Sequence, residues 1–267
     1  MAIDPDKQRK IIVVHGVQTG DDDGLNQDEL IRSLFENRLG DLDLDYAVDL
    51  YRYENMNNEV LDKYQNLVGL IINNPIGSKL AQSVIDIVGD VVISLAQGST
   101  ADKIRQGLTD KILDYYNEGH PCYVVAHSLG TVYSFDVINQ LMNNNDYFDR
   151  DDRLTWPVLG WLSMGSPLGL NMFKETGRQS LTELGAGDGE FPWRNYYDPN
   201  DPVVSGSIFG SQLGNVKIAE AYIDDSDTQG WWARDYSINT GKLHLLAHTA
   251  YWDIPVVGDG IRSMVSE

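Results

Sequence analysis

The segment PCYVVAHSLGTVYSFDVINQLM, residues 121–142, is the clearest local indication of how this chain folds. Residues 121–127 form a short apolar run rich in β-branched side chains, which is typical of a strand buried on both faces. From Thr131 onward, apolar residues recur at helical spacing. Only Ser128, Leu129 and Gly130 separate the two patterns, so the sequence predicts a buried strand that turns sharply into a helix.

Similar apolar runs alternate with helical patterns along the rest of the chain. We expect strands at 10–16, 46–53, 121–127, 157–164, 193–197 and 216–223, and helices at 26–39, over most of 58–118, at 131–142 and at 260–265. This alternation predicts the α/β class, with a mostly parallel central sheet and helices on both faces. Without a repeat or a low-complexity linker, we expect one domain over 1–267, with 58–100 as a helical cap insertion.

Composition narrows the function classes. The chain has 267 residues, of which 42% are hydrophobic, and this excludes wholesale disorder; its mixed charge excludes a fibrous protein. Its formal net charge of -20 repels phosphate backbones and anionic lipid headgroups, so nucleic-acid binding is not expected. Cys122 is the single cysteine, which excludes an internal disulfide and a cysteine-rich metal site.

The sequence also bears on location. Residues 1–10, MAIDPDKQRK, lack the apolar stretch of a secretory signal. The most apolar long segment, 80–96, has 17 residues and is interrupted by Asp86, Gly89 and Asp90. A buried or lid-like helix therefore fits it better than a membrane span. We expect a cytoplasmic protein whose membrane contact is at most interfacial.

The turn between strand and helix carries a reactive-serine pattern. Residues 126–130, AHSLG, match G-x-S-x-G with Ala126 in place of the first glycine. In such a turn the serine hydroxyl stands above the sheet edge, and the backbone N–H of the next residue, Leu129, points to the substrate oxygen. Gly130 supplies the second small residue. The alternative, that Ser128 only caps the helix, is disfavoured because a strand precedes it and a helix follows.

A serine nucleophile needs a base and a carboxylate that orients the base. His248 opens the terminal segment HTAYWDIP and is preferred over His244, whose apolar context KLHLLAH suits a packed histidine. Asp198 and Asp201 both lie in DPNDP after an expected strand. We prefer Asp201 as the carboxylate and interpret Asp198 as the turn-former. The chain order Ser128, Asp201, His248 follows one of the known triad orders, serine then acid then histidine.

Further residues are expected to shape this site. His15, Gly16 and Val17 end the first expected strand, where a turn can supply a second oxyanion-binding N–H, assigned to Val17. His15 is interpreted as shaping that turn and not as the base. His127 lies inside the serine turn. Ser166, after a Gly-Ser-Pro turn, either faces the site or serves the turn, and the sequence leaves both open.

These motifs together resemble the α/β-hydrolase superfamily, in particular the lipase/esterase-like branch that includes class 3 lipases and inositol deacylase-like proteins. The resemblance implies the α/β-hydrolase fold and acyl-transfer chemistry. Ala126 departs from the usual glycine, and no recognised substrate-defining motif follows the core. The matching segments are HGV (15–17), GDVVISL (89–95), VVAHSLGTVYSFDVI (124–138), WLSMGSPLGL (161–170), NYYDPNDPVV (195–204) and AHTAYW (247–252).

We therefore expect a serine hydrolase that cleaves carboxylic esters, with a small-molecule ester or lipid as substrate and no metal or organic cofactor. A serine peptidase or amidase, and a catalytically silent binding module, are the alternatives. The acidic loop 19–24 lacks EF-hand spacing. Segment 66–97 is either a lid over the site or a helical layer on the sheet, and no protein partner is indicated.

Overall fold

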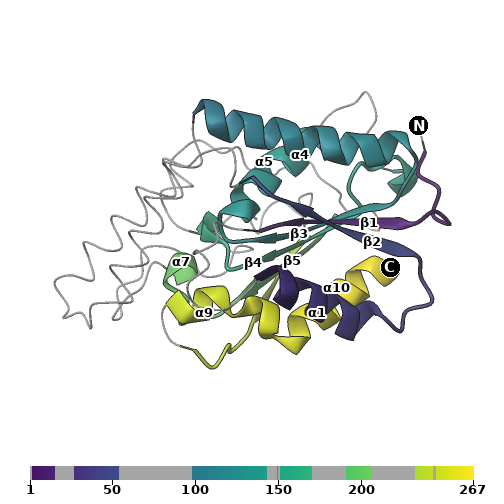
Figure 1. Ribbon diagram of the computed structural model, residues 1–267. Coiled ribbons are helices and arrows are strands. Elements are labelled where there is room, and N and C mark those ends of the chain that lie inside the picture. Colours follow the sequence, from purple (N-terminus) through teal and green to yellow (C-terminus); the bar gives the residue numbers. More distant parts are fainter. Residues whose placement is uncertain are drawn as a thin grey trace.

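The computed structural model in Figure 1 describes residues 2–15, 27–53, 98–142, 149, 151–169, 191–205, 232–242 and 245–267. Several expectations fall outside these residues. They are the cap at 58–100 except for its last three residues, the lid segment 66–97, the strand at 216–223, the acidic loop 19–24, and the residues Gly16, Val17 and His244.

Within the described part of the chain, six strands form one sheet in which every neighbouring pair is parallel. In spatial order they are β2 (Tyr46–Tyr51), β1 (Arg9–Val14), β3 (Cys122–His127), β4 (Gly160–Met164), β5 (Pro192–Tyr197) and β6 (Trp232–Ser237). Every residue of β3 and β4 is buried, as the apolar runs of these strands predict. The Cys122 thiol lies in this interior, where burial raises its pKa to about 12.

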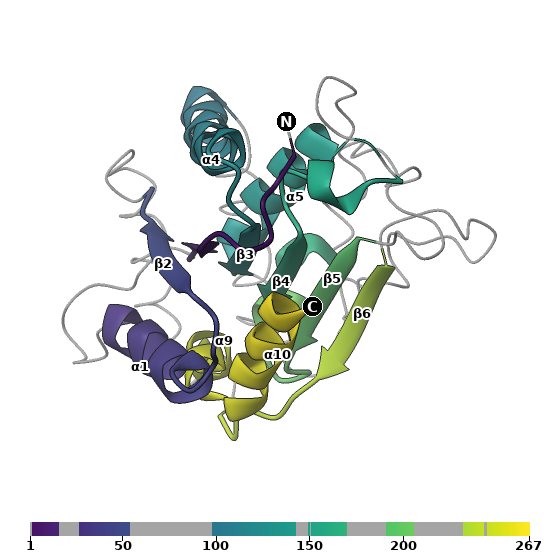
Figure 2. The same ribbon diagram turned by 90° about the vertical axis from the view of Figure 1, so that its right-hand side faces the viewer.

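Helices cover both faces of the sheet (Figure 2). On one face lie α4 (Ser99–Asn117) and α5 (Leu129–Met142), and on the other lie α1 (Gln27–Leu39) and α10 (Pro255–Ser266). Helix α5 packs on β1 and β3, and α10 packs on β4 and β5. Two short helices, α7 (Pro202–Ser205) and α9 (Leu245–Thr249), lie at the end of the sheet to which the strands point (Figure 1). Single 3₁₀ turns complete the described elements: η3 (Arg153–Thr155), η4 (Pro167–Gly169) and η6 (Tyr251–Asp253).

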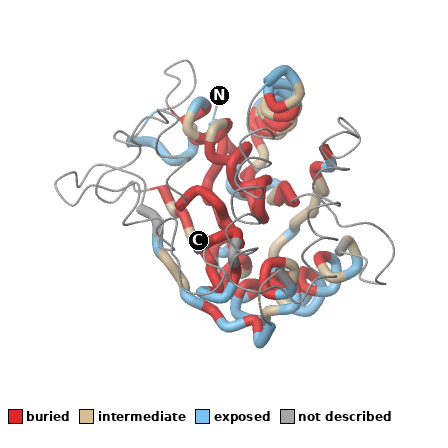
Figure 3. Tube along the Cα trace, turned by 90° about the vertical axis from the view of Figure 1, so that its left-hand side faces the viewer, coloured by how far each residue is buried: buried red, intermediate tan, exposed pale blue. Residues whose placement is uncertain are grey.

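The core follows from these layers, and Figure 3 shows the buried residues gathered in the sheet and on the helix sides that face it. Helix α4 buries one stripe of residues at spacings of three and four, as expected of a helix with one solvent-exposed side. The buried residues are Ala101, Ile104, Leu108, Ile112 and Tyr116. Helix α5 is buried almost all round. The polar residues Asp136, Asn139 and Gln140 are the ones that are not fully buried.

The structure confirms the α/β class with a parallel sheet. It differs from the expectations in β6 and in the start of the terminal helix, and the short helices α7 and α9 were not expected either. Strand β6 was not expected at 232–237, and the terminal helix begins at Pro255 instead of residue 260. Proline suits the first helical position because its missing N–H would have no intrahelical partner there. None of the helices in the described ranges combines the length and apolar character that a membrane crossing requires.

Candidate active site

The carboxyl ends of four neighbouring strands bring the predicted residues to one edge of the sheet. His15 follows β1, Ser128 follows β3, Gly165 follows β4, and Asp198 follows β5. In parallel α/β sheets this edge is where ligands bind. Each of the four residues directly follows a strand, so the sheet fixes their relative positions.

Ser128 occupies a strained turn. Its φ of 55° is in the left-handed region, and it is the one non-glycine residue with positive φ among the residues described. Its backbone N–H donates to the Met164 carbonyl at 3.0 Å, which fastens the turn to β4. A Cβ on Gly130 would lie 2.3 Å from the Val14 carbonyl oxygen, so only glycine fits there. Ala126 is fully buried in β3, and the sheet accommodates its extra methyl group.

Ser128, His248 and Asp201 form one hydrogen-bonded row. His248 Nε2 lies 2.7 Å from Ser128 Oγ, and His248 Nδ1 lies 2.8 Å from Asp201 Oδ2. A carboxylate only accepts, so Nδ1–H is the donor and Nε2 is left to accept the serine proton. The three residues are 5%, 2% and 0% exposed. This is the geometry of a nucleophile, a general base and a group that orients the base.

The two aspartates of the DPNDP segment have different partners. Asp201 Oδ2 accepts from His248, and its Oδ1 accepts from the Val203 N–H at 2.9 Å. Asp198 instead accepts from the Asn200 N–H at 2.8 Å and from Thr240, through its N–H at 2.8 Å and its hydroxyl at 2.7 Å. Asp198 is therefore the turn-former, and it also joins the loop after β5 to the segment after β6.

With this row in place, the parallel sheet, the strand–serine–helix turn and the chain order serine, aspartate, histidine are all observed. The fold is an α/β-hydrolase fold. The lipase/esterase-like branch remains a resemblance of the sequence.

Comparisons with known proteins show similarity to solved structures. Scans against protein-family models and against curated proteins gave no significant match. Among solved structures, the chain is similar to a novel cutinase-like protein from Cryptococcus sp., with 12% sequence identity and a TM-score of 0.34. That alignment covers 97% of this chain and 91% of the other.

His127 is hydrogen-bonded to the backbone of His248. Its Nε2–H donates to the backbone carbonyl of His248 at 2.8 Å, and the two ring centroids are 4.8 Å apart. Burial, followed by the neighbouring His248, holds the pKa of His127 well below its usual 6.5. His127 is therefore a neutral donor that fixes the backbone of His248.

Sequence reasoning missed Tyr251, the first residue of η6. Its hydroxyl donates to Asp201 Oδ2 at 2.9 Å and accepts from the Asp198 N–H at 2.9 Å. Burial, and then the charge of Asp201, raise the pKa of Tyr251 well above its usual 10, so the phenol stays protonated. Nothing in the local sequence marks this tyrosine, because its partners come from the loop after β5.

Gly165 and Ser166 follow β4. Gly165 has a φ of 57°, and a Cβ there would lie 3.2 Å from His248 Cε1 and 3.0 Å from Tyr251 Cε2. Ser166 is buried, with its Oγ 2.8 Å from the Thr131 hydroxyl. Its Oγ also accepts from the Leu168 N–H at 3.3 Å within its own turn, so both roles that the sequence left open for Ser166 stay open.

Two further points concern the residues expected near the oxyanion and the question of a metal site. Leu129 is the first residue of α5, where backbone N–H groups have no intrahelical partner and the helix dipole is positive. His15 is fully buried at the end of β1, next to Gly16 and Val17, which lie outside the described residues. Among the described residues, no group of histidine, cysteine and acidic side chains could hold a metal ion.

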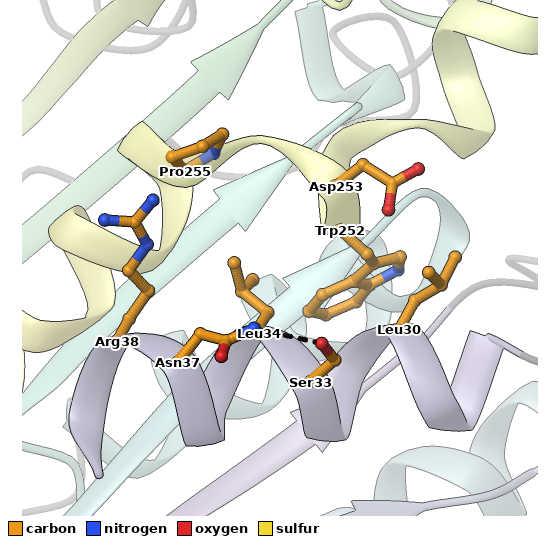
Figure 4. Close-up of a pocket in the computed structure, with 8 residues that line it drawn as sticks. All are labelled: Leu30, Ser33, Leu34, Asn37, Arg38, Trp252, Asp253 and Pro255. Carbon is orange, nitrogen blue, oxygen red and sulfur yellow. Dashed lines mark hydrogen bonds between the residues drawn. The ribbon is translucent and has the colours of Figure 1, made fainter.

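A pocket of about 400 Å³ lies beside this site, between α1 and the start of α10 (Figure 4). None of the three residues of the hydrogen-bonded row lines it, although Trp252 directly follows Tyr251 in the chain. Its lining residues are Leu30, Ser33, Leu34, Asn37, Arg38, Trp252, Asp253 and Pro255.

Proposed function

We propose that this protein is a serine hydrolase of carboxylic esters, with Ser128 as nucleophile, His248 as general base and Asp201 as the carboxylate that orients the base. The hydrogen-bonded row, with 2.7 Å and 2.8 Å between its members, supports this proposal most directly. A serine that merely capped α5 would not need a buried histidine and a buried aspartate in line behind it.

In the proposed reaction, Ser128 Oγ attacks the ester carbonyl carbon while His248 Nε2 takes the hydroxyl proton. The tetrahedral intermediate collapses to an acyl-enzyme when the alcohol leaves with the proton from His248. Water then attacks the acyl carbon, with His248 again as base, and the carboxylic acid and free Ser128 are released. Asp201 holds Nδ1–H throughout and stabilises the imidazolium form.

The negative oxygen of each intermediate needs donors. We assign this role to the backbone N–H groups of Leu129 and Val17, the first of which lies at the positive end of the 14-residue helix α5. Two such donors together lower the barrier by several kcal/mol, on the order of 3 kcal/mol each. Ala126 and Gly130 keep the turn tight enough to aim the first of them.

The substrate class proposed is a small-molecule ester or a lipid, as in the lipase/esterase-like branch that the sequence resembles. Every chemical step of the scheme uses side chains, backbone amides and water, without a metal or organic cofactor. The triad itself also cleaves amides, so the ester preference rests on that resemblance.

Covalent labelling tests the proposal. We expect a fluorophosphonate to label the wild type, and the variant Ser128→Ala to lose both labelling and hydrolysis of p-nitrophenyl esters, by roughly 10³-fold or more in kcat. The matched control is Ser134→Ala, another buried serine of the same region, whose hydroxyl bonds the Gly130 carbonyl at 2.8 Å.

The outcomes separate the three functions. Labelling with turnover of p-nitrophenyl esters, and none of peptide amides, supports the ester hydrolase. Turnover of the amides instead would assign a peptidase or amidase. Turnover retained by Ser128→Ala would show that the nucleophile is another residue, and an unlabelled, inert wild type would identify a silent binding module.

A further inference from the structure

The Tyr251 hydroxyl occupies a position that packing alone does not require. Its ring lies among aromatic neighbours, 5.7 Å from the His127 ring and 6.5 Å from the His248 ring between centroids, and a phenylalanine would fill the same space. The hydroxyl adds two hydrogen bonds, one accepted from the Asp198 N–H and one donated to Asp201 Oδ2, both 2.9 Å long.

Both of these hydrogen bonds help to position His248, the proposed base. Asp201 Oδ2 accepts from Tyr251 at 2.9 Å and from His248 Nδ1 at 2.8 Å, so a single carboxylate oxygen holds the base and is itself held by the phenol. The phenol in turn is fixed by the Asp198 amide, at the end of β5. A continuous chain of hydrogen bonds therefore runs from the sheet to Ser128.

We infer that Tyr251 is a positioning residue of the proposed hydrolase, which holds Asp201 in line with His248 and tempers the negative charge that Asp201 presents to the imidazolium. This inference rests on the proposed function. Tyr251 acts through Asp201 and touches no reacting atom of the scheme.

The direction in which the pH profile of activity should shift follows from Asp201 Oδ2, the oxygen that accepts from both Tyr251 and His248. A carboxylate oxygen that loses one donor presents more negative charge to its remaining donor, and this favours the protonated form of the imidazole. Removing the phenol is therefore expected to move the acidic limb of the activity profile to higher pH.

The groups that face His248 from the packed elements fix the electrostatic setting. Among the described residues, four groups face His248: the Ser128 hydroxyl, the His127 ring, the Asp201 carboxylate and the Tyr251 phenol. Behind them, the Asp198 N–H is bonded to Tyr251, and His15 acts electrostatically on His127. Tyr251→Phe changes only one of these groups and leaves the ring in place.

The variant Tyr251→Phe tests the inference. We expect kcat to fall roughly tenfold while KM stays within about twofold, because the alignment of base and nucleophile is loosened and substrate contacts are not. The acidic limb of the kcat/KM profile should move to higher pH by roughly 0.4 to 1 pH unit, the equivalent of one ordinary hydrogen bond.

Tyr51→Phe is the matched control. Tyr51 is also a buried tyrosine, and its hydroxyl donates to the Ile104 carbonyl at 2.8 Å, away from the hydrogen-bonded row. This variant should lose stability as Tyr251→Phe does, and keep the wild-type kcat and pH profile. If both variants shift the profile equally, or neither does, Tyr251 is a packing residue and the inference is wrong.

A measurement that does not depend on turnover, the proton NMR chemical shift of His248 Nδ1–H, separates this inference from the proposed function. In proton NMR spectra, the His248 Nδ1 proton should move downfield in Tyr251→Phe, because Asp201 Oδ2 then accepts from His248 alone. An unchanged or upfield position overturns the inference, even if ester hydrolysis is established. A downfield shift in a wild type that proves inert toward esters and fluorophosphonates would uphold the arrangement and refute the hydrolase.

If Tyr251→Phe does not fold, 3-fluorotyrosine at position 251 supplies the same test with the opposite sign. The fluorine makes the hydroxyl a stronger donor and keeps both hydrogen bonds. The acidic limb, followed through fluorophosphonate labelling rates, should then move to lower pH and the Nδ1 proton upfield. A shift in the other direction would contradict the inference.

Discussion

Single residues set the spacing of the site, and Gly165 is the most constrained of them. Its φ is 57°, and an added Cβ would come within 3.2 Å of both His127 Nε2 and His248 Cε1. Contacts this short require a neighbour to move. The neighbours are His248, the proposed base, and His127, which holds the His248 backbone, so a methyl group at this position acts directly on the geometry of the row.

We therefore predict that Gly165→Ala loses most of the proposed esterase activity and about 1–2 kcal/mol or more of unfolding free energy, from the left-handed backbone together with the contacts. Gly241 provides the control, because its φ is 69° and no atom of the described residues lies within 4 Å of an added Cβ. Gly241→Ala should show a similar backbone cost and full activity. Equal activity of the two variants, measured beside their urea unfolding curves, would refute the prediction.

At this scale the sequence predicts the members of the row better than their supports. Ser128, Asp201 and His248 each follow an expected strand or open a terminal segment, so local patterns and chain order are enough to select them. Tyr251 and Gly165 have no such local signal. Their importance comes from distances to side chains far away in the chain, which only the folded structure supplies.

Among the elements, β6 shows why local patterns fail at the edge of a sheet. Residues 232–237, WARDYS, lack an apolar run, because an edge strand is covered on fewer sides than β3 or β4. Its stability comes from pairing with β5 and from the bond between Asn195 Nδ2 and Asp235 Oδ1, 2.8 Å long. The inner strands, buried on both faces, carry their signal in sequence and were predicted.

The segment after β6 is held to the site through Thr240, whose hydroxyl donates to Asp198 Oδ2 at 2.7 Å. Thr240→Val keeps the shape and leaves this carboxylate oxygen one donor short, so we predict a loss of about 1.5–3 kcal/mol in unfolding free energy. Thr240→Ser retains the hydroxyl and should lose less than half of that. Chemical denaturation of the three proteins checks the order, and a valine variant as stable as wild type would contradict it.

For the molecule as a whole, stability should depend on pH through its buried imidazoles. The net charge of -20 changes little between pH 7.5 and 5.5, because carboxylates ionise below this range. His127 behaves differently, since burial holds its folded-state pKa well below the ordinary 6.5. In this interval the unfolded chain binds a proton at His127 that the folded chain does not, so the free energy of unfolding falls as the pH falls.

The expected size of this effect is about 1.4 kcal/mol from His127 alone between pH 7.5 and 5.5, given an unfolded-state pKa near 6.5. His127→Gln isolates it, because its amide N–H can occupy the place of Nε2 and still donate to the His248 carbonyl, while it does not titrate. Urea unfolding at several pH values should show the wild type losing about 1.4 kcal/mol more than the variant over this interval. Parallel curves would mean that His127 is protonated in the folded protein, where the imidazolium would lie 4.8 Å from the His248 ring and oppose the charge that the proposed base must carry.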